Sequence, residues 1–152
     1  MDAEQVVLTY GDMIYRIAMG YMKNKEDAED IYSEVFLILF KKEREFESEE
    51  HRKAWLIRVT INCCKQVLMK RPILEELNDE IVAPPAKGVS DEEKMDLYKA
   101  IANLKDEYRT VIELYYLQDC SVKQISEIME KPENTVKSHL MRAREKLKEY
   151  LS

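Results

Sequence analysis

The chain has 152 residues, of which 45% are apolar and 36% are charged, and its formal net charge is −6. Three glycines and four prolines are too few for the many turns of an all-β fold. No apolar run approaches the roughly 18 residues of a membrane span, and the N-terminal MDAEQVV lacks the basic residues of a signal peptide. These features predict an all-α, cytoplasmic protein that does not insert into the membrane.

Apolar residues recur at helical spacing through the first 71 residues. One stripe includes Val7, Ile14 and Tyr21, and a second runs through 28–38. A third helix is expected at roughly 52–70, with its apolar face on one side and polar residues on the other. The pattern predicts a small bundle of three to four helices.

The second stripe contains six consecutive apolar residues, VFLILF at 35–40. At about 100° per residue they wrap more than a full circle of a helix, whereas one core covers only part of that circle. Either this helix is buried on most sides, or Phe36, Leu37 and Phe40 bind a partner. Periodicity leaves both interpretations open.

The negative charge is concentrated in the middle of the chain. Residues 72–94 hold 2 Lys or Arg against 7 Asp or Glu, while 1–71 hold 12 against 13 and 95–152 hold 10 against 10. The middle segment also contains three of the four prolines. We therefore predict an acidic linker at 72–94 between two small helical domains, at 1–71 and 95–152.

Four helices are predicted in and just before the second domain, at about 91–103, 106–117, 122–129 and 132–150. The third would bury Val122, Ile125 and Met129, and the fourth Val136, Leu140, Ala143, Leu147 and Tyr150. A short helix, a tight turn and a longer basic helix make a helix-turn-helix.

The last predicted helix has a basic open side. Five Lys and Arg residues outweigh two Glu residues after position 135. A phosphate backbone would attract such a helix, but an ordinary solvated surface has the same pattern. The exposed candidates are Lys137, Ser138, Met141, Arg142 and Arg144.

The residues that catalysis or metal binding would require do not form a recognisable pattern. The three cysteines are an odd number, two of them adjacent, and are interpreted as reduced core residues. With only two histidines and no CxxC pair, zinc is not expected. No GxGxxG, P-loop or HExxH motif occurs. We predict a protein that is not an enzyme and that has no cofactor and no metal.

Three motifs in order resemble one known family. SVKQISEIMEKPENTVKSHLMRAREKL, at 121–147, resembles region 4 of the extracytoplasmic-function (ECF) sigma factors of the sigma-70 family. EDAEDIYSEVFLILF, at 26–40, and AWLIRVTINCCKQVLMKR, at 54–71, resemble parts of region 2. The resemblance spans nearly the whole chain and implies a factor that directs RNA polymerase to promoters, in response to stress or another signal.

The resemblance assigns a role to each domain. Region 2, at 1–71, would bind the clamp helices of the largest polymerase subunit and the −10 element; region 4, at 95–152, would bind the −35 element and the flap region. The residues implied for polymerase binding are Asp30, Ser33, Glu34, Leu37 and Phe40. The residues implied for binding the −10 element are Trp55, Arg58, Asn62 and Lys65. The residues implied for binding the −35 element are Thr135, Lys137, Ser138, His139, Met141, Arg142 and Arg144.

Several of these roles have plain alternatives. Trp55 is either a stacking platform for a base or a core anchor, and His139 either contacts phosphate or is solvated. The acidic linker either threads the basic channels of the polymerase or is a simple tether. An anti-sigma factor is a further implied partner, and would hold the protein at the membrane if it is itself a membrane protein.

The chain departs from the family pattern at several positions. Ser33 stands where glutamine is usual, and Gln66 stands where aspartate is usual. Thr60 and Ile61 replace the usual alanine and arginine. The loop before Trp55 is unusually acidic. These departures put core binding through Ser33, and the choice of bases at the −10 element, in question.

Two other function classes also fit the pattern. One is a stand-alone helix-turn-helix regulator whose first domain dimerises or senses a signal. The other is an adaptor that binds polymerase but not DNA. Co-purification with core polymerase separates the regulator from the other two, and promoter-specific transcription separates the sigma factor from the adaptor.

Overall fold

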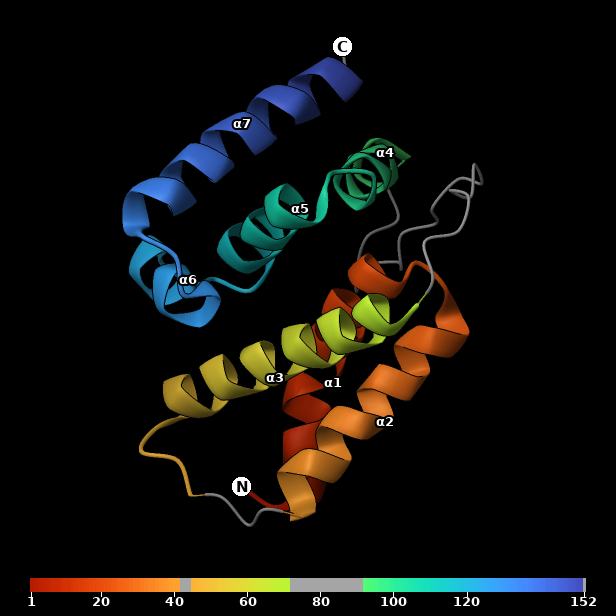
Figure 1. Cartoon of the computed structure of the whole chain (residues 1–152), viewed down its shortest axis with the longest axis vertical. Helices are drawn as coiled ribbons and strands as arrows, with labels where there is room; N and C mark the ends of the chain where they lie inside the picture. The colour runs from red at the N-terminus through yellow and green to blue at the C-terminus, as the bar shows by residue number, and fades with distance from the viewer. Residues whose placement is uncertain (42–44, 72–91, 152) are drawn as a thin grey trace. The chain divides into compact units, whose positions relative to one another are not determined.

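The structure is a computed structural model, and it describes residues 1–41, 45–71 and 92–151. The chain divides into two compact units, Met1–Leu77 and Asn78–Ser152. All regular structure in the described ranges is helical (Figure 1). The predicted all-α, two-domain fold is therefore confirmed.

The first unit is a bundle of three helices. They are α1 (Ala3–Met22), α2 (Lys25–Lys41) and α3 (Glu49–Lys70), and each contacts the other two. Asp2 caps α1 with a capping box that includes Gln5, and Ser48 caps α3 by accepting a hydrogen bond from the His51 N–H. The helix predicted at roughly 52–70 thus begins three residues earlier, at Glu49.

The core of the first unit follows the predicted stripes with a small shift. Ile14, Val35 and Leu56 are fully buried, and so is Thr60, whose hydroxyl donates to the Leu56 carbonyl at 2.7 Å. Val7 is only half-buried, because Val6 and Tyr10 occupy the core-facing positions of α1. The predicted burial of all three cysteines, Cys63, Cys64 and Cys120, is confirmed.

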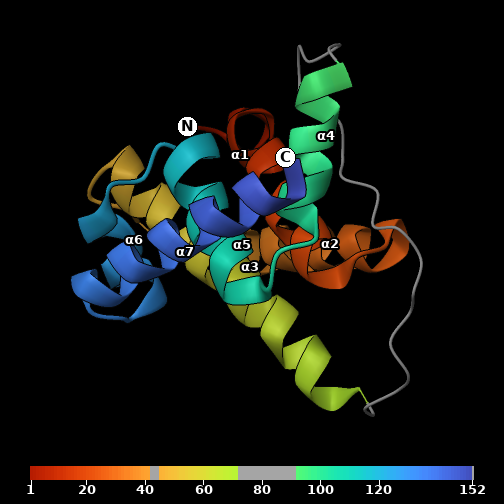
Figure 2. The same ribbon diagram turned by 90° about the horizontal axis from the view of Figure 1, so that it is seen from above.

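The second unit contains the predicted helices and one unforeseen element. They are α4 (Glu92–Ala102), α5 (Asp106–Ile112), η1 (Glu113–Leu117), α6 (Val122–Met129) and α7 (Glu133–Leu151). The predicted continuous helix at 106–117 changes to a π-helix at Glu113, where the Gln118 N–H donates to the Glu113 carbonyl at 3.0 Å. Figures 1 and 2 both show the C-terminal end of α7 beside α4 and its N-terminal end beside α6.

Burial in the second unit corrects several predicted core positions. Tyr150 is 58% exposed, because the core contacts of α7 end before its last turn, and Leu147 is half-buried. Val122 and Met129 are also half-buried, since α6 turns Ile125 and Ile128 toward the core instead. The predicted burial of Val136, Leu140 and Ala143 is confirmed.

The predicted linker lies almost entirely outside the described residues. Residues 72–91 are not described, and α4 begins at Glu92, within the predicted span of 72–94.

Candidate functional site

The helix-turn-helix presents one open face on α7. Ser121 caps α6 through a capping box with Gln124, and Glu130 ends α6 in the left-handed conformation with φ of 55°. The Pro132 carbonyl then accepts a hydrogen bond from the Val136 N–H at 3.1 Å, where α7 begins. The buried residues of α6 and α7 pack together and leave five predicted DNA-binding residues exposed: Lys137, Ser138, Met141, Arg142 and Arg144.

Two other predicted DNA-binding residues are partly covered. Thr135 and His139 are half-buried. The His139 ring lies edge-to-face with that of Tyr108 on α5, with 5.5 Å between ring centroids. His139 is therefore a packed side chain of the second unit, which differs from the solvated histidine considered above.

Arg144 lies on a different side of α7 from Arg142. Two residues along a helix correspond to a rotation of about 200°. The Arg144 Nε donates a hydrogen bond to the Tyr116 hydroxyl at 2.6 Å, and its guanidinium lies 5.5 Å from the centroid of the Tyr116 ring. It also lies 5.9 Å from the Tyr115 ring. The residue that the motif assigns to DNA is thus held against η1 by cation–π contacts and a hydrogen bond.

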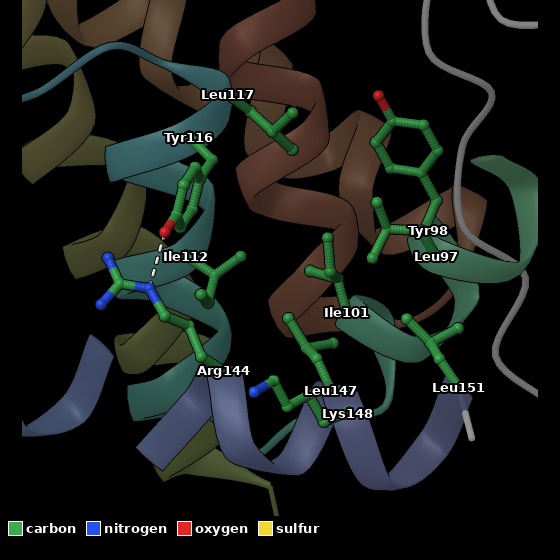
Figure 3. Close-up of a pocket in the computed structure, with 10 residues that line it drawn as sticks. All are labelled: Leu97, Tyr98, Ile101, Ile112, Tyr116, Leu117, Arg144, Leu147, Lys148 and Leu151. Carbon is green, nitrogen blue, oxygen red and sulfur yellow. Dashed lines mark hydrogen bonds between the residues drawn. The ribbon is translucent and has the colours of Figure 1, made fainter. Parts of the chain in front are cut away.

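An apolar groove adjoins Arg144 in the second unit (Figure 3). It lies between α4, the α5–η1 segment and α7, and its volume is about 710 Å³. Sequence reasoning missed this groove, because its walls come from three segments that are distant in the chain. Its lining residues are Leu97, Tyr98, Ile101, Ile112, Tyr116, Leu117, Arg144, Leu147, Lys148 and Leu151.

The predicted polymerase-binding residues of α2 share one exposed face. All five, Asp30, Ser33, Glu34, Leu37 and Phe40, are exposed. Their spacing of three or four residues places them on neighbouring turns of one side of the helix.

The VFLILF run is divided between the core and this face. Leu37 and Phe40 are 59% and 44% exposed, whereas Phe36 is 6% exposed and Leu39 is 7% exposed. The suggestion that Phe36 serves a partner is therefore wrong: its ring packs edge-to-face on Tyr32, with 5.0 Å between centroids. Leu37 and Phe40 form an apolar patch beside Asp30 and Glu34.

The predicted −10 residues of α3 also share an exposed side. Arg58, Asn62 and Lys65 are exposed, and Gln66 lies next to them. Thr60 and Ile61, two of the departures from the family pattern, are buried, so they act through packing rather than as part of this surface.

Trp55 differs from these residues because it is half-buried. Its ring lies 5.5 Å from that of Phe46, centroid to centroid, and Phe46 also contacts His51 at 5.3 Å. The Arg52 guanidinium lies 5.2 Å from the Phe46 ring. Trp55 therefore packs on Phe46 of the acidic loop and is partly covered, but it does not belong to the buried core that the anchor interpretation expected.

The first turn of α3, which follows this loop, is tied to α1 by a charged network. The Tyr10 hydroxyl donates to Glu49 Oε2 at 2.6 Å, and Arg52 Nη1 lies 3.3 Å from Glu49 Oε1. Burial, followed by the hydrogen bond to Glu49, raises the pKa of Tyr10 to about 12. Phe46, Arg52 and Tyr10 had no signal in the sequence, because their roles depend on contacts between distant segments.

The described residues provide no metal site and no membrane span. Within 1–41, 45–71 and 92–151, no three His, Cys, Asp or Glu side chains gather as a metal site would require. Among the helices in those ranges, none has both the length and the apolar composition needed to cross a membrane.

Family comparisons match both units. The family described as "Sigma-70 region 2" matches residues 6–71, and "Sigma-70, region 4" matches residues 94–147. These two ranges contain every residue that was predicted to bind polymerase or DNA.

Curated relatives match along most of the chain. The RNA polymerase sigma factor SigV of Bacillus subtilis is 32% identical over 130 residues, which cover 85% of this chain and 78% of the relative. The ECF RNA polymerase sigma factor SigM of the same organism is 30% identical over 158 residues, which cover 97% of this chain and 94% of the relative.

Solved structures share the fold. The sigma factor RpoE of Bartonella quintana, solved in complex with the anti-sigma factor NepR, matches with a TM-score of 0.77 at 23% identity, covering 97% of this chain and 95% of that one. CnrH, solved with the cytosolic domain of CnrY, matches with a TM-score of 0.69 at 19% identity, covering 98% and 86%.

Proposed function

Because the chain belongs to the sigma-70 family, in its extracytoplasmic-function group, we propose that it directs core RNA polymerase to specific promoters. The observation that carries this proposal is that residues implied for polymerase and for DNA are exposed on three separate helix faces, on α2, α3 and α7. The relatives are transcription initiation factors, and polymerisation would belong to the core enzyme.

The open face of α7 would read the −35 element. A recognition helix enters the major groove, where side chains near its N-terminal half reach base edges. Ser138, Met141 and Arg142 are the candidates for base contacts, and Lys137 for phosphate. The half-buried Thr135 and His139 would contribute at the edge of this surface.

The exposed side of α3 would bind the non-template strand of the −10 element. Asn62 can hydrogen-bond to a base that has left the stack, and Arg58 and Lys65 can meet phosphates. Trp55 would support this surface indirectly, by holding Phe46 and the loop beside α3.

The exposed face of α2 would bind the clamp helices of the polymerase. Leu37 and Phe40 supply apolar area, and Asp30 and Glu34 supply charge beside it. An apolar patch flanked by charges is the arrangement that protein interfaces use for affinity and orientation. Ser33 lies on the same exposed face, one turn before Leu37, and would take the place of the usual glutamine contact.

The apolar groove of the second unit would hold a helix of the flap region. Its walls are mostly Leu, Ile and Tyr side chains, and an amphipathic helix places its apolar face into such a groove. The two functional domains would be 1–71 and 95–152, joined by the acidic segment.

Control of the protein would come from an anti-sigma factor that covers these same surfaces. One of the similar structures described above was co-crystallised with an anti-sigma factor, and the other was solved in complex with the cytosolic domain of CnrY. We infer a cytoplasmic protein that such a partner releases in response to a signal, and that is held at the membrane where the partner is itself anchored there.

Binding experiments with core RNA polymerase test this proposal. The chain should co-elute with core polymerase in gel filtration, and the two together should form heparin-resistant complexes on selected genomic DNA fragments. Sequence-specific protection of DNA by the chain alone, without any binding to polymerase, would indicate a stand-alone regulator instead.

A further inference from the structure

The apolar groove of the second unit has a charged edge. Among the residues that the structure describes, its lining comprises six aliphatic side chains, two tyrosines, Arg144 and Lys148, with no Asp or Glu. Both cations come from α7, and a separation of four residues places them on the same side of that helix. Figure 3 shows them along the α7 edge, with Arg144 beside Tyr116.

Arg144 is held at this edge rather than on the open face of α7. The hydrogen bond to Tyr116 uses Nε, one of the five N–H donors of a guanidinium. The contacts of the group with the rings of Tyr115 and Tyr116 limit its motion. The remaining donors of a side chain placed in this way can serve a carboxylate without a further large loss of conformational entropy.

We propose that the helix docking in this groove is an acidic amphipathic helix, with carboxylates along the edge that faces Arg144 and Lys148. The inference rests on the proposed docking of a polymerase flap helix and adds the chemistry by which that helix is chosen. Opposite charges at the border of an apolar interface fix orientation and disfavour a partner whose edge is basic. Arg144 is then a residue of the docking surface and not of the DNA surface.

Two synthetic peptides test the charge preference directly. Each is an amphipathic helix of about 18 residues, long enough to hold helical structure in water. They have the same leucine face and differ only in whether Glu or Lys flanks it. Fluorescence anisotropy with the full chain at low salt should show the Glu peptide binding about 5- to 20-fold more tightly, since each partly exposed ion pair contributes modestly.

The preference should depend on the two cations and on salt. Arg144→Gln combined with Lys148→Gln should bind both peptides about equally, whereas Lys146→Gln, which removes a charge from α7 outside the groove, should keep the preference. Raising the salt concentration should shrink it. Arg144→Gln alone should bind a promoter −35 duplex as tightly as the unaltered chain. Circular dichroism checks that each variant remains helical.

The possible failures are distinguishable. Equal binding of both peptides by the unaltered chain would overturn the charge inference and leave docking in the groove intact. If neither peptide binds, both the charge inference and the proposed docking of a helix in the groove would be overturned. Tighter binding of the Lys peptide would also overturn the charge inference, and a loss of −35 affinity in Arg144→Gln would return Arg144 to the DNA surface.

Discussion

Replacing Leu37 by Asp is expected to abolish polymerase binding while leaving the helical fold in place. Leu37 is 59% exposed on α2, so most of its apolar surface contributes nothing to the stability of the free protein. Complete burial of a Leu side chain contributes about 1.5–3 kcal/mol, and the exposed part of Leu37 therefore has roughly 1–2 kcal/mol to gain on docking.

The substituted carboxylate adds a second penalty. An Asp at an apolar contact must lose hydration without gaining a partner, which brings the total loss of binding free energy to at least about 3 kcal/mol, or roughly a hundredfold in affinity. The cost to folding should be about 1–2 kcal/mol, the combined effect of the lost burial of the covered part of Leu37, of helix propensity and of a negative charge near the C-terminal end of α2.

Leu39 provides the matched control. It lies two residues further along the same helix and is 7% exposed. Leu39→Ala should destabilise the first unit by about 2–5 kcal/mol, because it leaves a cavity in the core.

Biolayer interferometry with immobilised core polymerase of Bacillus subtilis, the source of two relatives, measures binding, and urea unfolding measures stability. The reasoning fails if Leu37→Asp unfolds the first unit, or if it binds core polymerase as tightly as the unaltered chain.

Three further predictions concern DNA binding, pH and domain structure. Arg142→Ala should weaken binding to the −35 duplex by about 1–3 kcal/mol and should change binding to a scrambled duplex little. Lys137→Ala should weaken binding to both duplexes alike, and should reduce by about 1 the slope of the logarithm of the binding constant against the logarithm of the salt concentration. Fluorescence anisotropy over a salt series measures both effects, and identical behaviour of the two variants would count against these roles. Because the pKa of Tyr10 is raised to about 12 in the folded chain, the unfolded chain releases this proton first as pH rises above about 10, and the free energy of unfolding falls between about pH 10 and 12. Tyr10→Phe should lessen that fall in urea titrations, and an unchanged pH slope would argue against the Tyr10–Glu49 hydrogen bond. Fragments 1–71 and 92–152, expressed separately, should each be helical by circular dichroism and melt cooperatively; a fragment that is unfolded alone would contradict two independent domains.

Features that repeat along one helix could be predicted from the sequence. The exposed face of α2 and that of α3 follow from the 3.6-residue period, which places Asp30, Glu34 and Leu37, or Arg58, Asn62 and Lys65, on one side. The same period identified most of the core of both units. It could not decide how VFLILF divides, because that depends on where α1 and α3 meet α2.

Features that depend on contacts between segments could not be predicted in this way. The Phe46 cluster requires the loop before α3 to fold back on Trp55, and the groove requires α4, η1 and α7 to meet. The π-helix depends on a shift in backbone hydrogen bonding, seen where the Gln118 N–H donates to the Glu113 carbonyl, and this shift leaves no periodic pattern in the residues. Arg144 shows the limit of motif reasoning, since its position in the motif implies DNA and its Tyr116 contact implies the groove.

The central claim is that this chain gives core polymerase its promoter specificity, and transcription reconstituted from purified parts tests it most directly. Core polymerase of Bacillus subtilis would be incubated with genomic DNA from the source organism, with and without the chain, and the 5′ ends of the transcripts mapped. Discrete start sites should appear only with the chain, each preceded by the same two short elements at constant spacing. Start sites that are unchanged by the chain, or that share no upstream elements, would contradict the assignment of α3 and α7 to promoter recognition.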